Sequence, residues 1–299
     1  MNTATRWLLA LAFAFSCPFV GACHAQKAHA THPAHPARPA PSADLPAGVK
    51  RIGFIEDPRI TESSGVVASR EHPGIFWTHN DGPRSYTLYA IGRDGKSLGN
   101  FHLAGVVIHD WEDIAIDGEK HLYVGDIGNN DARRFLLAVH RIDEPDPKNS
   151  GASVAVTRSW QLRFPKDPFD CETLFVWKDF GYVVSKVFND ARAEIYRFPL
   201  TEQKEPFTLE FVTRLKIDSP VTGGDISVDG RLLGLVAKSG AFAYRIKGDV
   251  SKAGTVKPVH TKFKHEHIEG CCFVPDGLLA TAETGEIFLF TDPAFHPAK

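Results

Sequence analysis

From Val49 onward, hydrophobic residues occur in short runs that are typical of β-strands. The runs are rich in Val, Ile, Phe and Tyr, and each is closed by Gly, Pro, Asn or Asp, which are turn residues. No long segment has apolar residues at helical spacing. The pattern therefore predicts a single all-β domain over residues 49–299.

A phrase of acidic and then apolar residues recurs five times in this domain. Three copies are clear, at Glu62–Ser69, Asp110–Asp117 and Asp170–Trp177. Two weaker copies are Thr222–Asp229 and His267–Val274, and the five starts lie 48, 60, 52 and 45 residues apart. Repetition at such a period indicates copies of one structural unit.

Further strand-like segments follow each phrase. Second strands are expected at Ile75–His79, His121–Gly125, Tyr182–Lys186, Leu232–Lys238 and Leu278–Glu283. Third strands are expected at Thr87–Ile91, Phe135–Ile142, Glu194–Leu200, Ala241–Ile246 and Glu286–Phe290. Fourth strands are expected at Leu98–Leu103, Val154–Phe164, Leu209–Ile217 and Val256–Phe263, so the last repeat lacks one.

Four strands per repeat make the blade of a β-propeller. The unassigned segment Val49–Glu56 can supply the missing outer strand and close the ring between the two ends of the domain. We therefore predict a β-propeller of five four-stranded blades. Six blades is the alternative, and no segment is left over to build the sixth.

The first residues have the pattern of a secretion signal. Arg6 ends a short polar start, and Trp7–Val20 is mostly apolar but too short to span a bilayer. Val20–Cys23 matches the pattern cut by the lipoprotein signal peptidase, which leaves a lipidated Cys23, and cleavage at another small residue is the alternative. We predict a signal peptide over 1–23 and an exported protein, either periplasmic, anchored at the outer membrane or secreted.

Residues 24–48 are rich in Ala, Pro and His and are predicted to form a disordered tether. Beyond the tether the chain has three cysteines. Cys271 and Cys272 are neighbours and face opposite sides of a strand, so we expect buried thiols, with a disulfide through Cys171 as the alternative.

Composition and charge exclude several classes. The chain has 299 residues, is 43% hydrophobic and carries a formal charge of −2, which is not the basic footprint of a nucleic-acid-binding protein. Its five cysteines are too few for a disulfide scaffold of this size. We expect a monomer with no nucleic-acid partner, whose membrane contact is a lipid anchor at Cys23 or none.

The propeller topology brings unusual polar residues together, because the starts of the first strands and the ends of the second strands meet at one mouth of the channel. The first-strand starts carry Glu62, Asp110, Glu112, Asp113, Asp170, Glu172, Asp225 and Glu269. The second-strand ends carry Asn80, Asp81, Asp126, Asn129, Asn130, Lys186, Lys238 and Glu283. The mouth is predicted to be acidic on one side and cationic on the other.

Crowded carboxylates repel unless they bind a cation, share protons or pair with lysines. Oxygen-only clusters suit Ca²⁺. The candidate ligands are Asp110, Glu112, Asp113, Asp126, Asn129 and Asn130. Two alternatives stay open: these residues form turns and cap strands, or the channel glutamates pair with Lys186 and Lys238.

Histidines near the mouth offer other chemistry. His265, His267 and Glu269 alternate, so an extended backbone projects all three from one side, where Zn²⁺ is a less favoured cofactor than Ca²⁺. His79 and His109 flank the acidic clusters and are candidate acid–base groups or packing residues. No motif of a nucleophilic hydrolase is present.

Four phrases resemble a group of secreted bacterial β-propeller proteins of the phytase-like or esterase-like type. They are Glu62–Ser69, Phe76–Gly82, Asp110–Ala115 and Leu122–Asn130, within a similarity that covers residues 55–290. The resemblance implies the fold and export. Calcium-dependent propeller phytases bind Ca²⁺ through carboxylates and activate water against a phosphate ester, although their acidic signature has no evident copy here.

Two functions remain open. In the first, the acidic cluster holds Ca²⁺ in a hydrolase of anionic esters or phosphoesters, Lys186 and Lys238 stabilise negative charge, and Glu172 or His109 moves the proton. In the second, the propeller binds a small anion, an envelope glycan or a protein without catalysis. The remaining residues expected at the mouth are Glu62, Asn80, Asp81, Asp225, His267, Glu269 and Glu283.

Overall fold

The computed structural model describes residues 45–188 and 192–297. The predicted signal peptide and tether residues 24–44 lie outside these ranges. Leu45 packs against a cluster of buried side chains, and the Val49 N–H donates to the Pro46 carbonyl at 3.0 Å. The last residues assigned to the tether, 45–48, therefore belong to the folded domain.

The described strands form five four-stranded antiparallel blades. Blade one holds β2 (Ser63–Ala68), β3 (Ile75–Asn80), β4 (Thr87–Gly92) and β5 (Ser97–Ala104), and blade two holds β6 (Trp111–Ile116), β7 (His121–Asp126), β8 (Leu136–Asp143) and β9 (Ser153–Arg163). Blade three holds β10 (Cys171–Trp177), β11 (Phe180–Ser185), β12 (Glu194–Pro199) and β14 (Glu210–Arg214), and blade four holds β15 (Val221–Ile226), β16 (Leu232–Ala237), β17 (Gly240–Arg245) and β18 (Val259–Lys262).

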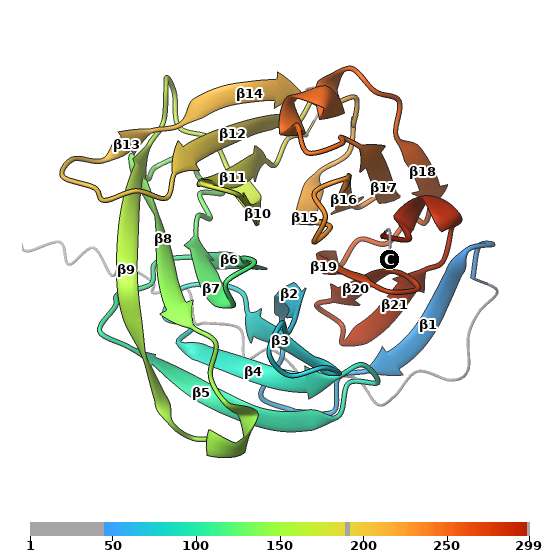
Figure 1. Cartoon of the computed structure of the whole chain (residues 1–299), viewed down its shortest axis with the longest axis horizontal. Coiled ribbons are helices and arrows are strands. Elements are labelled where there is room, and N and C mark those ends of the chain that lie inside the picture. The colour runs from blue at the N-terminus through green and yellow to red at the C-terminus, as the bar shows by residue number, and fades with distance from the viewer. Residues whose placement is uncertain (1–44, 189–191, 298–299) are drawn as a thin grey trace, which may run out of the picture. The chain divides into compact units, whose positions relative to one another are not determined.

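Blade five closes the ring. It holds β19 (Ile268–Val274), β20 (Gly277–Ala282) and β21 (Glu286–Phe290), and β1 (Val49–Phe54) is its outer strand, with Val49 opposite Phe290. The innermost strands β2, β6, β10, β15 and β19 surround the centre, each in contact with the next and β19 in contact with β2 (Figure 1). The predicted β-propeller is confirmed, and the strand pairing agrees with five blades closed by the N-terminal strand.

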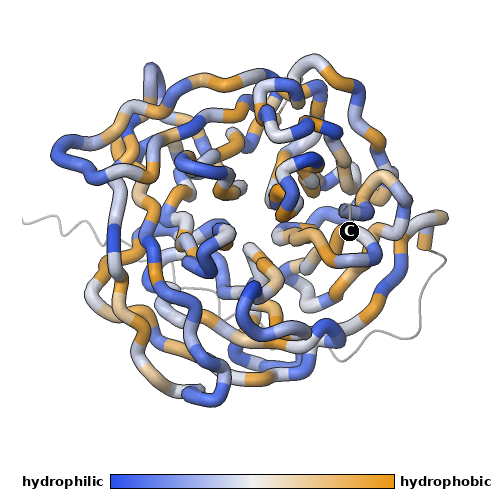
Figure 2. The backbone as a smooth tube through the Cα atoms, in the orientation of Figure 1, coloured by the Kyte–Doolittle hydropathy of each residue, from blue (hydrophilic) through white to orange (hydrophobic). Residues whose placement is uncertain are grey.

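The hydrophobic core lies between the blades. Five clusters of buried side chains each join residues of two consecutive blades, and the last joins blade five to blade one. All six positions of β6, β15 and β16 are buried, because a sheet packed on both faces buries successive side chains on its two sides. Figure 2 shows hydrophobic residues in the strands all around the ring. Cys271 and Cys272 belong to different clusters, and both are free, buried thiols, as is Cys171.

The outer strands of the first three blades are also joined. The long strand β9 pairs in parallel with β5 through Ser153 and His102, and with the short strand β13 (Phe207–Thr208) near its other end. The only helical turns in the described residues are of the 3-10 type: η1 (Pro147–Asn149), η2 (Val250–Gly254) and η3 (Pro293–Phe295). None of the described helices is long and apolar enough to cross a membrane.

Candidate functional site

One backbone hydrogen bond recurs where each innermost strand begins. The carbonyl of the residue at that position accepts the N–H of a residue that follows the second strand of the same blade. The pairs are Glu62 with Asp81 (2.9 Å), Asp110 with Gly128 (3.2 Å), Asp170 with Lys186 (2.8 Å), Pro220 with Lys238 (3.1 Å) and His267 with Glu283 (2.9 Å). This bond holds both ends of every inner hairpin at one mouth of the channel.

Blade four differs from the sequence alignment by two residues. Pro220, and not Thr222, occupies the recurring position. Asp225 therefore lies further along β15, where its carboxylate accepts the N–H of Ile226 and, from the next blade, the N–H of Phe273, each at 2.8 Å. Asp225 joins two blades and does not line the mouth, so the prediction that placed it there from the repeated phrase is wrong.

A polar pocket of about 280 Å³ lies at this mouth, and we call it the mouth pocket. It takes at least one residue from each blade. Its lining residues are Ser64, Asp81, Glu112, Asn130, Glu172, Lys186, Lys238, Glu266, His267, Glu269 and Glu283. Most of these were expected at the mouth from the sequence, whereas Ser64 and Glu266 were not among the predicted site residues.

Three carboxylates gather on one side of the mouth pocket. Asp81, Asp110 and Glu112 each have an oxygen within 4.8 Å of the others. Glu112 is only 3% exposed. When both acids are ionised, Oε1 of Glu112 and Oδ1 of Asp81 have no hydrogen-bond donor. This carboxylate cluster needs a cation or shared protons to be stable.

Burial and mutual repulsion raise the pKa values of the cluster. Burial is the largest cause for each acid and raises the pKa of Asp81 to about 7, with Asp110 and Glu62 adding repulsion. The pKa of Glu112 is raised well above its ordinary value by burial and then by Asp81, and a shared proton between the two lowers the pKa of Asp81. The cluster therefore holds protons at neutral pH when no cation is present.

The turn after β7 is shaped to fit against the cluster. A Cβ atom on Gly128 would lie 2.1 Å from Oε1 of Glu112 and 2.4 Å from Oδ2 of Asp110. Arg134 fixes this turn by donating to the Gly128 carbonyl at 2.7 Å and by pairing with Asp126 at 3.0 Å. The sequence reasoning missed Arg134, because an arginine after a loop carries no signal of its own.

Two lysines also line the mouth pocket. Lys186 forms an ion pair with Glu172, and its Nζ lies 5.9 Å from the centre of the Phe188 ring. Lys238 lines the pocket with no ion pair among the described residues. Burial, followed by repulsion from Glu283, raises the pKa of Glu269 to about 8, although both lysines oppose that rise.

Several predicted ligands serve the backbone instead of the pocket. Both oxygens of Asp113 accept backbone N–H groups, from Ile114 and from Leu174 in the next blade, each at 2.8 Å. Oδ1 of Asp126 accepts the N–H groups of His109 and Asp110. These roles match the alternative in which acidic residues cap strands and turns.

The amides and one histidine are likewise engaged outside the pocket. The Asn129 side chain accepts from the Arg134 N–H at 2.8 Å, and Asn80 accepts from the Thr61 N–H at 2.9 Å. The carbonyl of Glu62 bonds Asp81, but the residue does not line the pocket. His109 is also absent from the lining of the mouth pocket. Its side chain is 65% exposed and contacts the Asp126 carboxylate.

The other histidines do not form the predicted arrangement. Glu266 and His267 lie in a turn, so the extended backbone that would project His265, His267 and Glu269 from one side is absent. His267 pairs with Glu283 at 2.7 Å. His79 is fully buried and stacks on Trp111, and burial lowers its pKa to about 3, so it is a neutral packing residue.

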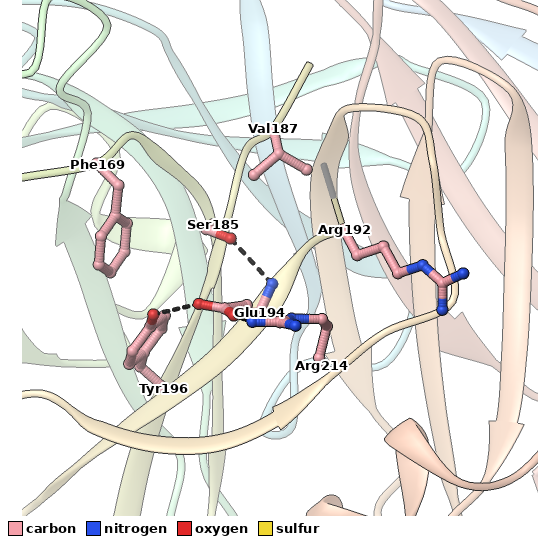
Figure 3. Close-up of a pocket in the computed structure, with 7 residues that line it drawn as sticks. All are labelled: Phe169, Ser185, Val187, Arg192, Glu194, Tyr196 and Arg214. Carbon is pink, nitrogen blue, oxygen red and sulfur yellow. Dashed lines mark hydrogen bonds and ion pairs between the residues drawn. The ribbon is translucent and has the colours of Figure 1, made fainter. Parts of the chain in front are cut away.

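A second hollow, the side pocket, of about 520 Å³ lies beside β11 and β12 (Figure 3). Phe169 and Tyr196 form its aromatic wall, with ring centres 4.8 Å apart. Its acid, Glu194, is already bound by Arg214 and by the Tyr196 hydroxyl. The side pocket therefore combines an aromatic wall with the charged side chains of Arg192, Glu194 and Arg214.

No family model and no curated protein matches this chain. Among solved structures, hydrazine synthase of Kuenenia stuttgartiensis is 12% identical, with a TM-score of 0.42 over 78% of this chain and 72% of that chain. Virginiamycin B lyase of Staphylococcus aureus, as its selenomethionine form, is 13% identical, with a TM-score of 0.43 over 80% of this chain and 69% of that chain. Likenesses of this strength carry no argument about function, and the propeller assignment rests on the strand pairing.

Proposed function

We propose that the mouth pocket binds a divalent cation, with Ca²⁺ as the leading candidate. The observation that carries the proposal is the cluster of Asp81, Asp110 and Glu112, whose oxygens lie within 4.8 Å of one another with buried oxygens that lack donors. Ca²⁺ takes six to eight oxygen ligands at flexible positions, and the Asn130 amide lines the same pocket. Zn²⁺ fits less well, because the cluster has no nitrogen or sulfur ligand.

The cation would prepare the pocket for a small anionic ligand. With its acids protonated and no cation bound, the carboxylate cluster offers an anion no positive charge. With the cation bound, the ligand would lie between the cation and the ammonium groups of Lys186 and Lys238. A phosphate or carboxylate group matches this pairing of a metal with lysines.

The second candidate function is hydrolysis of an anionic ester or phosphoester. It is favoured by Glu269, whose pKa of about 8 keeps it protonated at neutral pH and able to donate a proton to a leaving group. The cation would supply an activated water and polarise the ester. Glu269 takes the proton-transfer role that we had given to Glu172 or His109, and the resemblance to phytase-like and esterase-like propellers agrees with this chemistry.

We place this function outside the cytoplasm, as the N-terminal signal pattern predicts, in a monomer that is periplasmic, secreted or anchored through Cys23. A non-enzymatic propeller that binds an envelope glycan or protein is the alternative. In that case the cation has a structural role, and no ester is turned over.

Calcium titration of the chelator-treated full chain by calorimetry tests the cation site. We expect one Ca²⁺ per chain and a higher melting temperature in its presence. Glu112→Gln should weaken binding by at least about tenfold, because it removes a charged ligand. Glu119→Gln is the matched control, because Glu119 is an exposed acid in the turn between β6 and β7, at the other end of that hairpin from the mouth.

If calcium addition gives no heat of binding and no rise in melting temperature, the proposed cation site is wrong. Shared protons and pairing with lysines would then explain how the crowded carboxylates are tolerated. If calcium binds, turnover of 4-nitrophenyl phosphate decides the second candidate. Activity that is lost with chelator and with Glu112→Gln supports hydrolysis. Calcium binding without turnover supports the binding function.

A further inference from the structure

A half-exposed phenylalanine stands at the rim of the mouth pocket. Phe188 is 54% exposed and lies three residues beyond the end of β11. Its ring lies 5.9 Å from Nζ of Lys186, a lining residue of the mouth pocket. An apolar surface is therefore held directly beside one of the two ammonium groups that face the proposed anion.

The alternation of side chains explains this placement. Ser185 and Val187 line the side pocket, whereas Lys186, which lies between them in the chain, lines the mouth pocket. Phe188 is again on the side of Lys186. The lysine cannot leave easily, because it is also paired with the buried Glu172.

The residue before Phe188 lines a pocket with an aromatic wall. Val187 opens onto the side pocket, where the rings of Phe169 and Tyr196 stack (Figure 3). Among the polar groups of that pocket, Glu194 is bound by Arg214 and Tyr196, and Arg192 also lines it.

We infer that the mouth pocket selects anionic ligands in which an aromatic or apolar group is attached directly to the anionic group, such as an aryl phosphate ester. The anionic group lies between the cation and Lys186, and the apolar group lies on the ring of Phe188. Phe188 is thus a specificity-determining residue. This inference rests on the proposed function, because it takes the anion site at Lys186 as given.

An exposed apolar residue at the other end of a blade provides the control. Val228 is 68% exposed but lies on the turn between β15 and β16, at the far end of the inner hairpin from the mouth. It serves as a matched control, because its replacement by serine removes a similar exposed apolar side chain away from the pocket.

The test compares binding of methyl phosphate and phenyl phosphate to the calcium-loaded full chain by calorimetry. Phenyl phosphate should bind roughly five- to tenfold more tightly, as expected for one aromatic contact. Phe188→Ser should remove most of this preference and leave methyl phosphate affinity and calcium affinity unchanged. Phe188→Tyr should retain the preference, and Val228→Ser should not alter it.

The outcomes separate the two proposals. If neither phosphate binds in the presence of calcium, the proposed anion site fails and the inference fails with it. If both bind with equal affinity, or if Phe188→Ser leaves the preference intact, the anion site stands and the role of Phe188 is overturned.

Discussion

Alternation along a single strand decides which acids reach the mouth pocket. Glu112 faces the pocket, whereas its neighbour Asp113 faces the next blade and bonds the Leu174 N–H. The two acids are adjacent in sequence and have unrelated roles. The two residues just before Glu112 differ in the same way. Asp110 belongs to the carboxylate cluster, whereas Trp111 is fully buried in the core.

Gly128 is the residue whose replacement tests the shape of the cluster most directly. In Gly128→Ala the new Cβ would overlap the carboxylates of Glu112 and Asp110, at 2.1 and 2.4 Å. The acids must then move apart, so calcium affinity measured by calorimetry should fall by about tenfold or more, with little change in fold. Gly118→Ala is the control, because its Cβ meets nothing within 4 Å. Equal calcium affinity in both variants would contradict this role of Gly128.

At the scale of the element, most strands could be predicted from the sequence. The runs of apolar residues and the turn signals placed the third strand of blade five at Glu286–Phe290, as the structure has it. The start of blade four was misplaced, because Gly223, Gly224 and Asp225 imitate the repeated phrase while Pro220 occupies the structural position. A pattern of residue types does not reveal which carbonyl closes the hairpin.

The site could be predicted only in part for a related reason. The topology brought Asp81, Lys186 and Glu269 to one mouth, but the direction of a carboxylate within a turn depends on nearby donors. Asp126 looked like a ligand, yet it is held by the N–H groups of His109 and Asp110. Such contacts between a side chain and distant backbone leave no trace in residue spacing.

Asp225 links blades four and five through its hydrogen bonds, and we call this link the Asp225 clamp. Asp225 is buried and accepts the N–H groups of Ile226 and Phe273. Asp225→Asn replaces one accepting oxygen with an NH₂ group, which leaves one buried N–H unsatisfied. We expect the free energy of unfolding in urea to fall by about 1–3 kcal/mol. Asp167→Asn, at an exposed acid, should change it by less than about 0.5 kcal/mol, and an equally small change at Asp225 would refute the clamp.

For the whole molecule, closing the ring concentrates charge in one place. Every blade contributes at least one side chain to the mouth pocket, and burial there raises the pKa values of Asp81, Glu112 and Glu269. Ionising these acids lowers the free energy of unfolding of the whole domain, because the inner strands that carry them contact one another around the closed ring. Stability and cation binding should therefore be linked through pH.

The sign of this linkage follows from the direction of the shifts. The folded chain holds protons on Asp81 up to about pH 7 and on Glu269 up to about pH 8, whereas the unfolded chain has released them near pH 4. The folded state thus binds more protons, and stability falls as pH rises through these values. The buried His79, with its pKa lowered to about 3, opposes the trend only below about pH 6.5.

We expect the chelator-treated protein to lose about 5 °C in melting temperature between about pH 7 and pH 8.5, because acids must ionise in a buried cluster without a counter-charge. Calcium should remove most of this loss, since a bound cation favours the ionised acids, and calcium affinity should rise over the same interval as protons are displaced. Glu112→Gln should make the melting temperature less dependent on pH in the absence of calcium. Differential scanning calorimetry across this pH interval, with calcium and with chelator, measures these melting temperatures. A melting temperature that rises with pH in the chelator-treated protein would mean that the mouth acids are already neutralised by their lysine partners.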